Sequence, residues 1–286
     1  MHAPMLARGP QTRLAAVWAR QHDAARDLAR AFGSVAVSSH DELLDACEAV
    51  AYAVPPDVQA GLAPVAARAG RAVMLEKPLG LDLRQARAVA EAVTAAGVPN
   101  ILVLTKRFHP STEAFLDEVA GVRAQGPVTG VLAAYLHGFT LHGGAAATAW
   151  RLEHGALLDL GPHLVDLVDA AAGPIRSVRA GGDPRTYLTI STEHDAGVGQ
   201  LALSGAVALD QALTRVEVFS AHGSARWDTA GIDHDECWPV LRAEFANAVR
   251  HGSAVRADVA RGLSLQLVLD AVTRSLSEDR RVVVDE

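Results

Sequence analysis

The segment Ala72-Val73-Met74-Leu75-Glu76-Lys77-Pro78-Leu79-Gly80 joins an apolar run to an acid, a base and a proline. A short apolar run that ends in turn residues is typical of a strand buried on both faces, as in a parallel sheet. Ligands of open α/β sheets bind at the carboxyl ends of the strands, where Lys77 would lie. Pro78 restricts the turn that presents Lys77, and its peptide bond can be cis. For an isolated Glu-Lys dipeptide, a solvated pair in a loop is the simpler interpretation.

The first part of the chain, up to about residue 105, repeats this pattern, which indicates β-α-β units and a parallel sheet. The predicted strands are Leu14–Ala19, Val35–Ser38, Ala49–Val54, Ala72–Glu76 and Ile101–Leu104. The predicted helices are His22–Phe32, Asp41–Cys47, Val58–Ala69 and Leu83–Ala96. Gly33, Gly70 and Gly97 each follow a predicted helix, where a left-handed C-terminal cap is expected.

The pattern changes after a further helix, predicted over residues 110–124, and the segment Gln125-Gly126-Pro127. Strand-like runs then follow at Val128–Leu136, Ser177–Ala180, Arg185–Ser191, Val198–Leu203, Leu213–Phe219 and Ala225–Trp227. Helices at Cys237–Arg250 and Val259–Leu276 and a short strand at Arg281–Val284 end the chain. We therefore predict an α/β plus α+β fold: a Rossmann-like parallel sheet in residues 1–125, and an open, mostly antiparallel sheet in a substrate and oligomerisation domain, residues 126–286.

One segment of the second domain, Gly155 to Asp166, places three titratable groups among apolar and small residues. Pro162 is tolerated only in the first turn of a helix, which predicts a helix from about Gly161 to Ala172 with Asp159 at or just before its start. A histidine with a carboxylate in reach suits general acid/base chemistry on a hydroxyl, which makes Asp159 and His163 candidate site residues. A capping aspartate beside a structural histidine is the alternative.

Composition limits the possible classes of protein. The formal net charge of −7, with scattered Lys and Arg, argues against a nucleic-acid surface and a polybasic membrane patch, so small-molecule partners are favoured. Cys47 and Cys237 form no CxxC motif and no zinc spacing, and the chain has no signal pattern or long apolar run. These features predict a soluble, cytoplasmic protein without a disulfide framework or a metal site.

The chain resembles the Gfo/Idh/MocA family of oxidoreductases over nearly its whole length. The resemblance rests on Glu76-Lys77-Pro78, on the DxGxH pattern from Asp159 to His163, on Trp150-Arg151, and on Arg107-Phe108-His109-Pro110. It implies a Rossmann domain, an α+β substrate domain, and Lys77, Asp159 and His163 as catalytic residues. We expect His163 to be the acid/base, Asp159 to orient it or the substrate, and Lys77 to bind a substrate oxygen. The substrate pocket is expected from the loop His137–His154 and a face of the second sheet.

The sequence departs from the family at its start, because it contains no GxGxxG turn. We interpret residues 2–8 as the end of the family's first helix, and expect the first strand and glycine loop to lie upstream of Met1. That strand is central in a Rossmann sheet, so its absence should leave two strand edges unpaired. A mis-assigned start or a truncation is the favoured explanation, and a natural protein without this element is the alternative.

Cofactor-binding residues are expected at the strand ends and nearby motifs. They are Ala19, Arg20, Val54, Pro55, Pro56, Gln59, Glu76, Lys77, Pro78 and Arg107. Ala19 stands where an acid would bind the ribose of NAD, and Arg20 follows it, which weakly favours NADP over NAD. An exposed cation at a helix start is the alternative for Arg20.

Three functions are compared. The leading one is an NAD(P)-dependent oxidoreductase for a sugar, polyol or related carbonyl, assembled as a homodimer or homotetramer. The alternative is a non-catalytic ligand- or partner-binding protein of the same fold, which the missing glycine loop would support. A metal-dependent enzyme built on the histidines has no support from their spacing.

Overall fold

A computed structural model describes residues 2–142 and 148–285. Residues 143–147, which belong to the loop expected to shape the substrate pocket, lie outside the described residues. By its contacts the chain divides into two compact units: residues 1–103 with 236–263, and residues 104–235 with 264–286. This division falls before the boundary predicted at residues 125–126, which stays a prediction. The two units are described separately below.

The first unit contains short parallel strands in two sheets. β1 (Ala16–Val17) pairs with β2 (Val35–Ala36), while β3 (Ala49–Ala51), β4 (Ala72–Glu76) and β5 (Asn100–Val103) form a second sheet in that order. The expected interruption of the parallel sheet is therefore present between β1 and β3. The three central residues of β4, Val73 to Leu75, are completely buried, as predicted for a strand covered on both faces.

Helices flank these strands. They are α1 (His2–Ala7), α2 (His22–Ala31), α3 (His40–Asp45), α4 (Pro56–Arg68), α5 (Leu83–Ala96), α10 (Cys237–His251) and the start of α11 (Val259–Glu278). The side chain of Asp82 accepts a hydrogen bond from the Gln85 amide and thereby caps α5, whose other end is closed by Gly97 in the left-handed conformation. Local capping therefore fixes both ends of α5 where the sequence predicts them.

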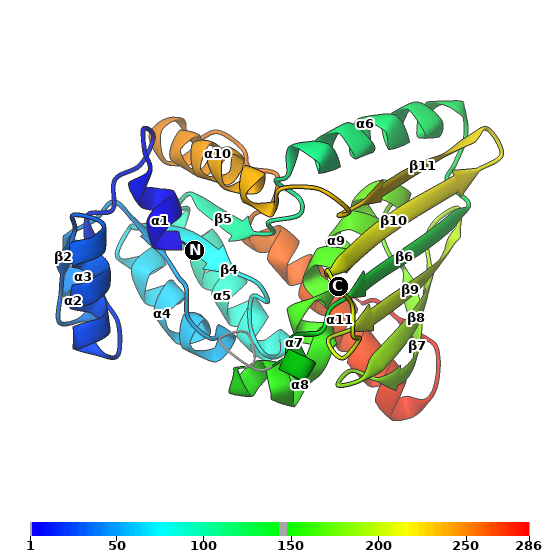
Figure 1. Ribbon diagram of the computed structural model, residues 1–286, viewed down its shortest axis with the longest axis horizontal. Coiled ribbons are helices and arrows are strands. Elements are labelled where there is room, and N and C mark those ends of the chain that lie inside the picture. Colours follow the sequence, from blue (N-terminus) through cyan, green and yellow to red (C-terminus); the bar gives the residue numbers. More distant parts are fainter. Residues whose placement is uncertain (1, 143–147, 286) are drawn as a thin grey trace. The chain divides into compact units, whose positions relative to one another are not determined.

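The second unit is built on an open sheet of seven strands (Figure 1). The order is β11 (Gly223–Asp228), β10 (Leu213–Ser220), β6 (Gly130–Leu136), β9 (Val198–Ser204), β8 (Tyr187–Glu193), β7 (Ser177–Asp183) and β12 (Val282–Val283). Only the β6–β9 pair is parallel, so the prediction of a mostly antiparallel sheet is confirmed.

The helices of the second unit are α6 (Pro110–Gln125), α7 (Phe139–His142), α8 (Ala149–Asp159), α9 (Gly161–Ala172) and the rest of α11, with a 3-10 turn at His234–Glu236. α9 runs along one face of the sheet and packs against β6 and β10 (Figure 1). Its predicted bounds are confirmed. The sequence prediction missed α8, because Gly155 interrupts that helix with a non-helical φ of 67° and so breaks its periodicity. No helix within the described ranges is long and apolar enough to span a membrane.

Candidate functional site

The turn after β4 carries Lys77 at the carboxyl end of the strand, in the first unit. The Lys77–Pro78 peptide bond is cis, and Pro78 is buried. Glu76 accepts a bond from the Lys77 amide at 3.3 Å, and its carboxylate contacts Nε2 of His2 at 2.6 Å. The Glu76 carboxylate therefore connects the turn that carries Lys77 to His2 of α1.

Gln59 anchors the same turn from α4. Its side chain is fully buried; the amide nitrogen donates to the Glu76 carbonyl at 2.8 Å, and its oxygen accepts from the Glu76 amide at 2.7 Å. Both ends of the Gln59 amide are thus used by backbone groups. Gln59, predicted to bind the cofactor, accordingly acts here as a positioning residue for the segment that precedes Lys77.

The other predicted cofactor residues of this unit follow β1 and β3. Ala19 is half-buried and Arg20 is exposed just before α2. Val54 is half-buried, Pro55 is the N-cap of α4, and Pro56 is its first residue. They lie at the carboxyl ends of parallel strands, the edge at which open α/β sheets bind ligands.

The junction of α8 and α9 carries the two other candidate catalytic residues, in the second unit. Asp159 is the last residue of α8, Leu160 joins the two helices, and His163 lies in the first turn of α9. Asp159 and His163 are each only 7% exposed. The sequence prediction of a carboxylate just before the helix that holds the histidine is confirmed in position, although Asp159 also ends a helix of its own.

Two arginines contact the acids of this junction. Nε of Arg151 lies 3.1 Å from Oδ1 of Asp159, and the Arg151 guanidinium stacks over the Trp150 ring at 5.0 Å. Arg107, predicted to bind the cofactor, contacts Oδ2 of the buried Asp166 at 3.7 Å. A buried carboxylate is costly unless it is paired, so each arginine offsets part of the cost of burying the acid that it contacts.

Tyr135 of the second unit lies between the side chains of Lys106 and His163 and is close to both. The Tyr135 ring on β6 lies 6.3 Å from the His163 ring, and Nζ of Lys106 lies 4.3 Å above the Tyr135 ring. Burial raises the pKa of the Tyr135 phenol, the nearby charge of Asp159 raises it further, and Arg151 opposes the rise. Tyr135 therefore stays a neutral phenol at ordinary pH and can donate a hydrogen bond, while His163 is the residue suited to move a proton.

The structure brings Asp159, His163 and Tyr135 together within the second unit and places Lys77 in the first. No sequence pattern marks Lys106 as a site residue, although Lys106 directly precedes the Arg107 motif. Across the part of the chain that the structure covers, no three His, Cys, Asp or Glu side chains form a cluster that could hold a metal ion.

Comparisons with known proteins identify the class. Residues 1–103 match the family described as "Oxidoreductase family, NAD-binding Rossmann fold". The whole chain superimposes on 93% of the structure titled "GenD2 from gentamicin A biosynthesis in complex with NAD", with a TM-score of 0.88 and 25% identity. The fold is therefore that of an NAD-binding oxidoreductase with a second, sheet-based unit.

Curated relatives give the same class. The chain is 29% identical to trans-1,2-dihydrobenzene-1,2-diol dehydrogenase of Mus musculus over 46% of this chain and 36% of that protein, so it matches about a third of that relative's length. It is 26% identical to D-xylose 1-dehydrogenase (NADP(+)) 2 of Haloferax volcanii over 97% of both chains. Residues 1–103 thus resemble the NAD-binding part of the Gfo/Idh/MocA oxidoreductases, and the two relatives are named dehydrogenases.

Proposed function

We propose that this chain is an NAD(P)-dependent oxidoreductase that transfers hydride between a nicotinamide and a sugar, polyol or related alcohol or carbonyl. The observation that carries the proposal is the α8–α9 junction, where His163 and Asp159 are buried together and Asp159 is paired with Arg151. A histidine held in this way suits proton transfer to or from a hydroxyl. The resemblance to this family supports the same reaction class.

Each residue has a distinct role in this proposal. His163 takes the hydroxyl proton when the alcohol is oxidised and returns it when the carbonyl is reduced. Asp159 orients the imidazole or the substrate, and Arg151 pairs with Asp159. Lys77 binds the substrate oxygen as an ammonium donor, and the cis turn and Gln59 fix where its side chain begins.

The residues present fit part of a dinucleotide. Arg20, the Pro55-Pro56 start of α4 and the Lys77 turn all follow strands at their carboxyl ends, and a helix start such as that of α4 favours anionic groups. These residues would hold the ribose and nicotinamide portions, while a glycine turn for the pyrophosphate is not part of this sequence. When bound, the nicotinamide accepts or supplies the hydride.

A weak preference for NADP belongs to this proposal, because Arg20 rather than an acid follows β1. Fluorescence titrations with NADPH and then NADH test it. We expect saturable binding with tighter NADPH, and Arg20→Gln should abolish the preference, whereas Arg84→Gln on the exposed face of α5 should not. Tighter NADH binding would refute the NADP preference, and no binding of either would favour a non-catalytic protein of the same fold.

Turnover of a panel of sugars and polyols tests the catalytic roles. His163→Asn and Lys77→Met should each lower kcat by about 100-fold or more, the usual range for loss of an acid/base group or a charged substrate contact, with little change in thermal stability. Val65→Ala, at an exposed position of α4, serves as the control. Unchanged turnover in both site variants would refute the assignment.

We also infer a homodimer or homotetramer that uses the open face of the second unit's sheet. Val198, Gly130 and Phe219 are direct neighbours on β9, β6 and β10, and Leu132 lies two residues along the same face. Val198, Leu132 and Phe219 are 60%, 49% and 39% exposed. An apolar patch of this kind on a soluble protein often marks a protein interface.

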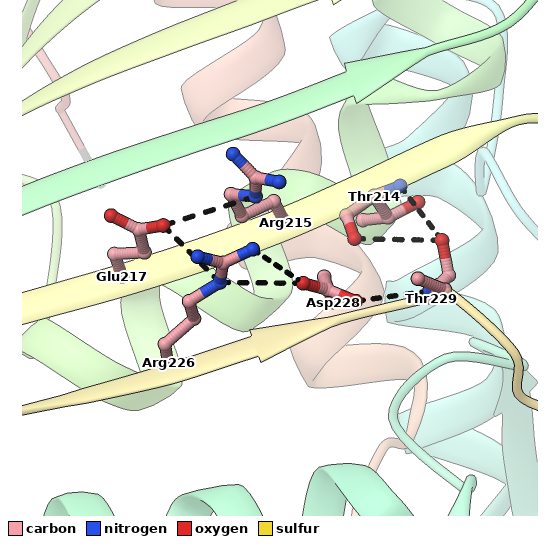
Figure 2. Close-up of polar contacts among 7 residues, drawn as sticks. Thr214, Arg215, Glu217, Arg226, Asp228 and Thr229 are labelled. Atoms are coloured by element: carbon pink, nitrogen blue, oxygen red, sulfur yellow. Dashed lines mark hydrogen bonds and ion pairs between the residues drawn. The ribbon is translucent and has the colours of Figure 1, made fainter.

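Charged pairs border this patch on β10 and β11 (Figure 2). Glu217 contacts Arg215 at 3.8 Å and Arg226 at 3.4 Å, and Arg226 contacts Asp228 at 2.9 Å. A polar rim around an apolar centre supports the proposed interface. Leu132→Lys should shift the protein to monomers in light scattering, while Leu152→Lys should not; an unchanged mass for Leu132→Lys would refute this face as the interface. In the described structure Cys47 and Cys237 form no disulfide, which agrees with the proposed reducing, cytoplasmic compartment.

A further inference from the structure

A cavity in the first unit lies at the edge of the strands opposite to Lys77. Its volume is about 630 Å³, and its walls include Ala15, just before β1, Ala49, the first residue of β3, and Arg71, just before β4. These are the amino ends of the parallel strands. Since a strand rises about 3.3 Å per residue, Arg71 and Lys77 are roughly 20 Å apart along β4. The cavity is therefore separate from the proposed cofactor edge.

Three arginines line this cavity: Arg13, Arg71 and Arg250. Two carboxylates, Asp45 and Glu48, line it as well, so the arginines are in excess in a chain whose formal net charge is −7. Within the described ranges none of the three arginines forms an ion pair with an acid. The three arginines and two carboxylates thus leave the lining of this cavity with one positive charge in excess.

Arg71 provides the most specific signal. Its Nε is buried and has no hydrogen-bond partner in the described structure. A buried donor without a partner costs free energy, and no group of the described structure pairs with the Arg71 guanidinium. The charge of Arg71 also affects Cys47, another residue of the cavity lining. Burial raises the pKa of the Cys47 thiol, and the Arg71 guanidinium opposes that rise.

Three hydrogen bonds from arginines of α10 reach Met5 and Gln11, and Gln11 is another residue of the cavity lining. Arg250 donates to the backbone carbonyl of Gln11, and Oε1 of Gln11 accepts from Nε of the buried Arg242 at 3.1 Å. Arg242 also donates to the Met5 carbonyl at 2.8 Å. Arg242 thus supports Gln11 from α10 and is not itself part of the cavity lining.

We propose that this cavity is a binding site for a small anion, namely a molecule that carries a phosphate or a carboxylate group. The arginine fork matches both groups in geometry, and the cavity volume lies in the range of small-molecule sites. The site does not depend on the proposed oxidoreductase function, because none of its residues belongs to the turn of Lys77 or to the α8–α9 junction.

Calorimetric titration and thermal unfolding with inorganic phosphate, and separately with citrate, test the proposal. Sodium chloride at matched ionic strength is the reference. At least one anion should bind saturably and raise the Tm above that in chloride, since a ligand of the native state stabilises it. The stronger of the two anions identifies whether the site prefers phosphate or carboxylate. The absence of binding by both would overturn the proposal.

Substitutions of the arginines that line the cavity test whether the anion binds there. Arg71→Gln should weaken the affinity about tenfold or more, and Arg71→Lys, which keeps the charge without the fork, should weaken it less. Arg84→Gln, which replaces an exposed arginine elsewhere in the unit, should bind as the wild type does. Equal affinity in Arg71→Gln and the wild type would refute the site. If Arg71→Gln does not fold, Arg13→Gln and Arg250→Gln, at exposed positions, give the same test.

Discussion

Replacement of Gln59 by leucine tests whether one buried amide holds the turn before Lys77. The substitution removes both partners of the Glu76 backbone, which Gln59 bonds at 2.8 and 2.7 Å in a fully buried position. Each backbone group left unsatisfied costs about 1–3 kcal/mol, and leucine recovers some of this through its apolar surface. We expect a loss of about 3 kcal/mol, which at roughly 2–4 °C per kcal/mol lowers the Tm by roughly 6–12 °C.

Hydrogen–deuterium exchange gives the local readout of this change. The Glu76 amide donates to Gln59, so exchange in residues 72–80 should accelerate in Gln59→Leu. Gln125→Leu is the matched control, because Gln125 is exposed on α6 and makes only a 3.4 Å bond to Gly121. A Tm within 2 °C of the wild type together with unchanged exchange in residues 72–80 would refute the anchoring role.

Two further predictions concern backbone strain and pH. Gly155→Ala should cost about 3 kcal/mol or more in urea unfolding, because its Cβ would lie 2.2 Å from the Pro184 carbonyl oxygen at a φ of 67°. Gly173→Ala, at a φ of 90° with open space, should cost only about 1–2 kcal/mol; equal costs would contradict the steric argument. Burial lowers the pKa of His40, so the unfolded state takes up the proton first. This contribution to stability is complete above the unfolded pKa of about 6.5 and is lost as the pH falls through the folded pKa. The His40→Gln variant should lose stability less steeply below pH 6.5, and parallel pH curves would contradict this.

The elements with local signals at both ends could be predicted from the sequence. β4, α5 and α9 have the predicted bounds, since turn residues, Asp82 and Gly97, and Pro162 with Gly173 mark their ends. β1 and β3 are shorter than predicted, because strand length depends on pairing with neighbours as well as on apolar runs. α8 was missed, since a helix that contains Gly155 at a positive φ has no regular period.

The site could be predicted only as far as its residues lie within short motifs. The positions of Asp159 and His163 follow from the placement of Pro162 in a first helical turn. Other residues that contact the candidate site residues are distant from them in the sequence. The Tyr135 ring lies near the His163 ring, and the Gln59 side chain bonds the backbone of Glu76. No spacing rule connects strands and helices at such separations, so these contacts required the fold.

The acidic groups beside the candidate catalytic residues of each unit have partners within their own unit. Glu76 contacts His2 beside the Lys77 turn, while Asp159 pairs with Arg151 and Asp166 with Arg107 at the α8–α9 junction. A binding group that is already oriented loses less conformational freedom when a ligand arrives, so more of the contact energy appears as affinity or rate. Each unit therefore orders its own catalytic candidates through internal contacts, and the ligand need not supply that order.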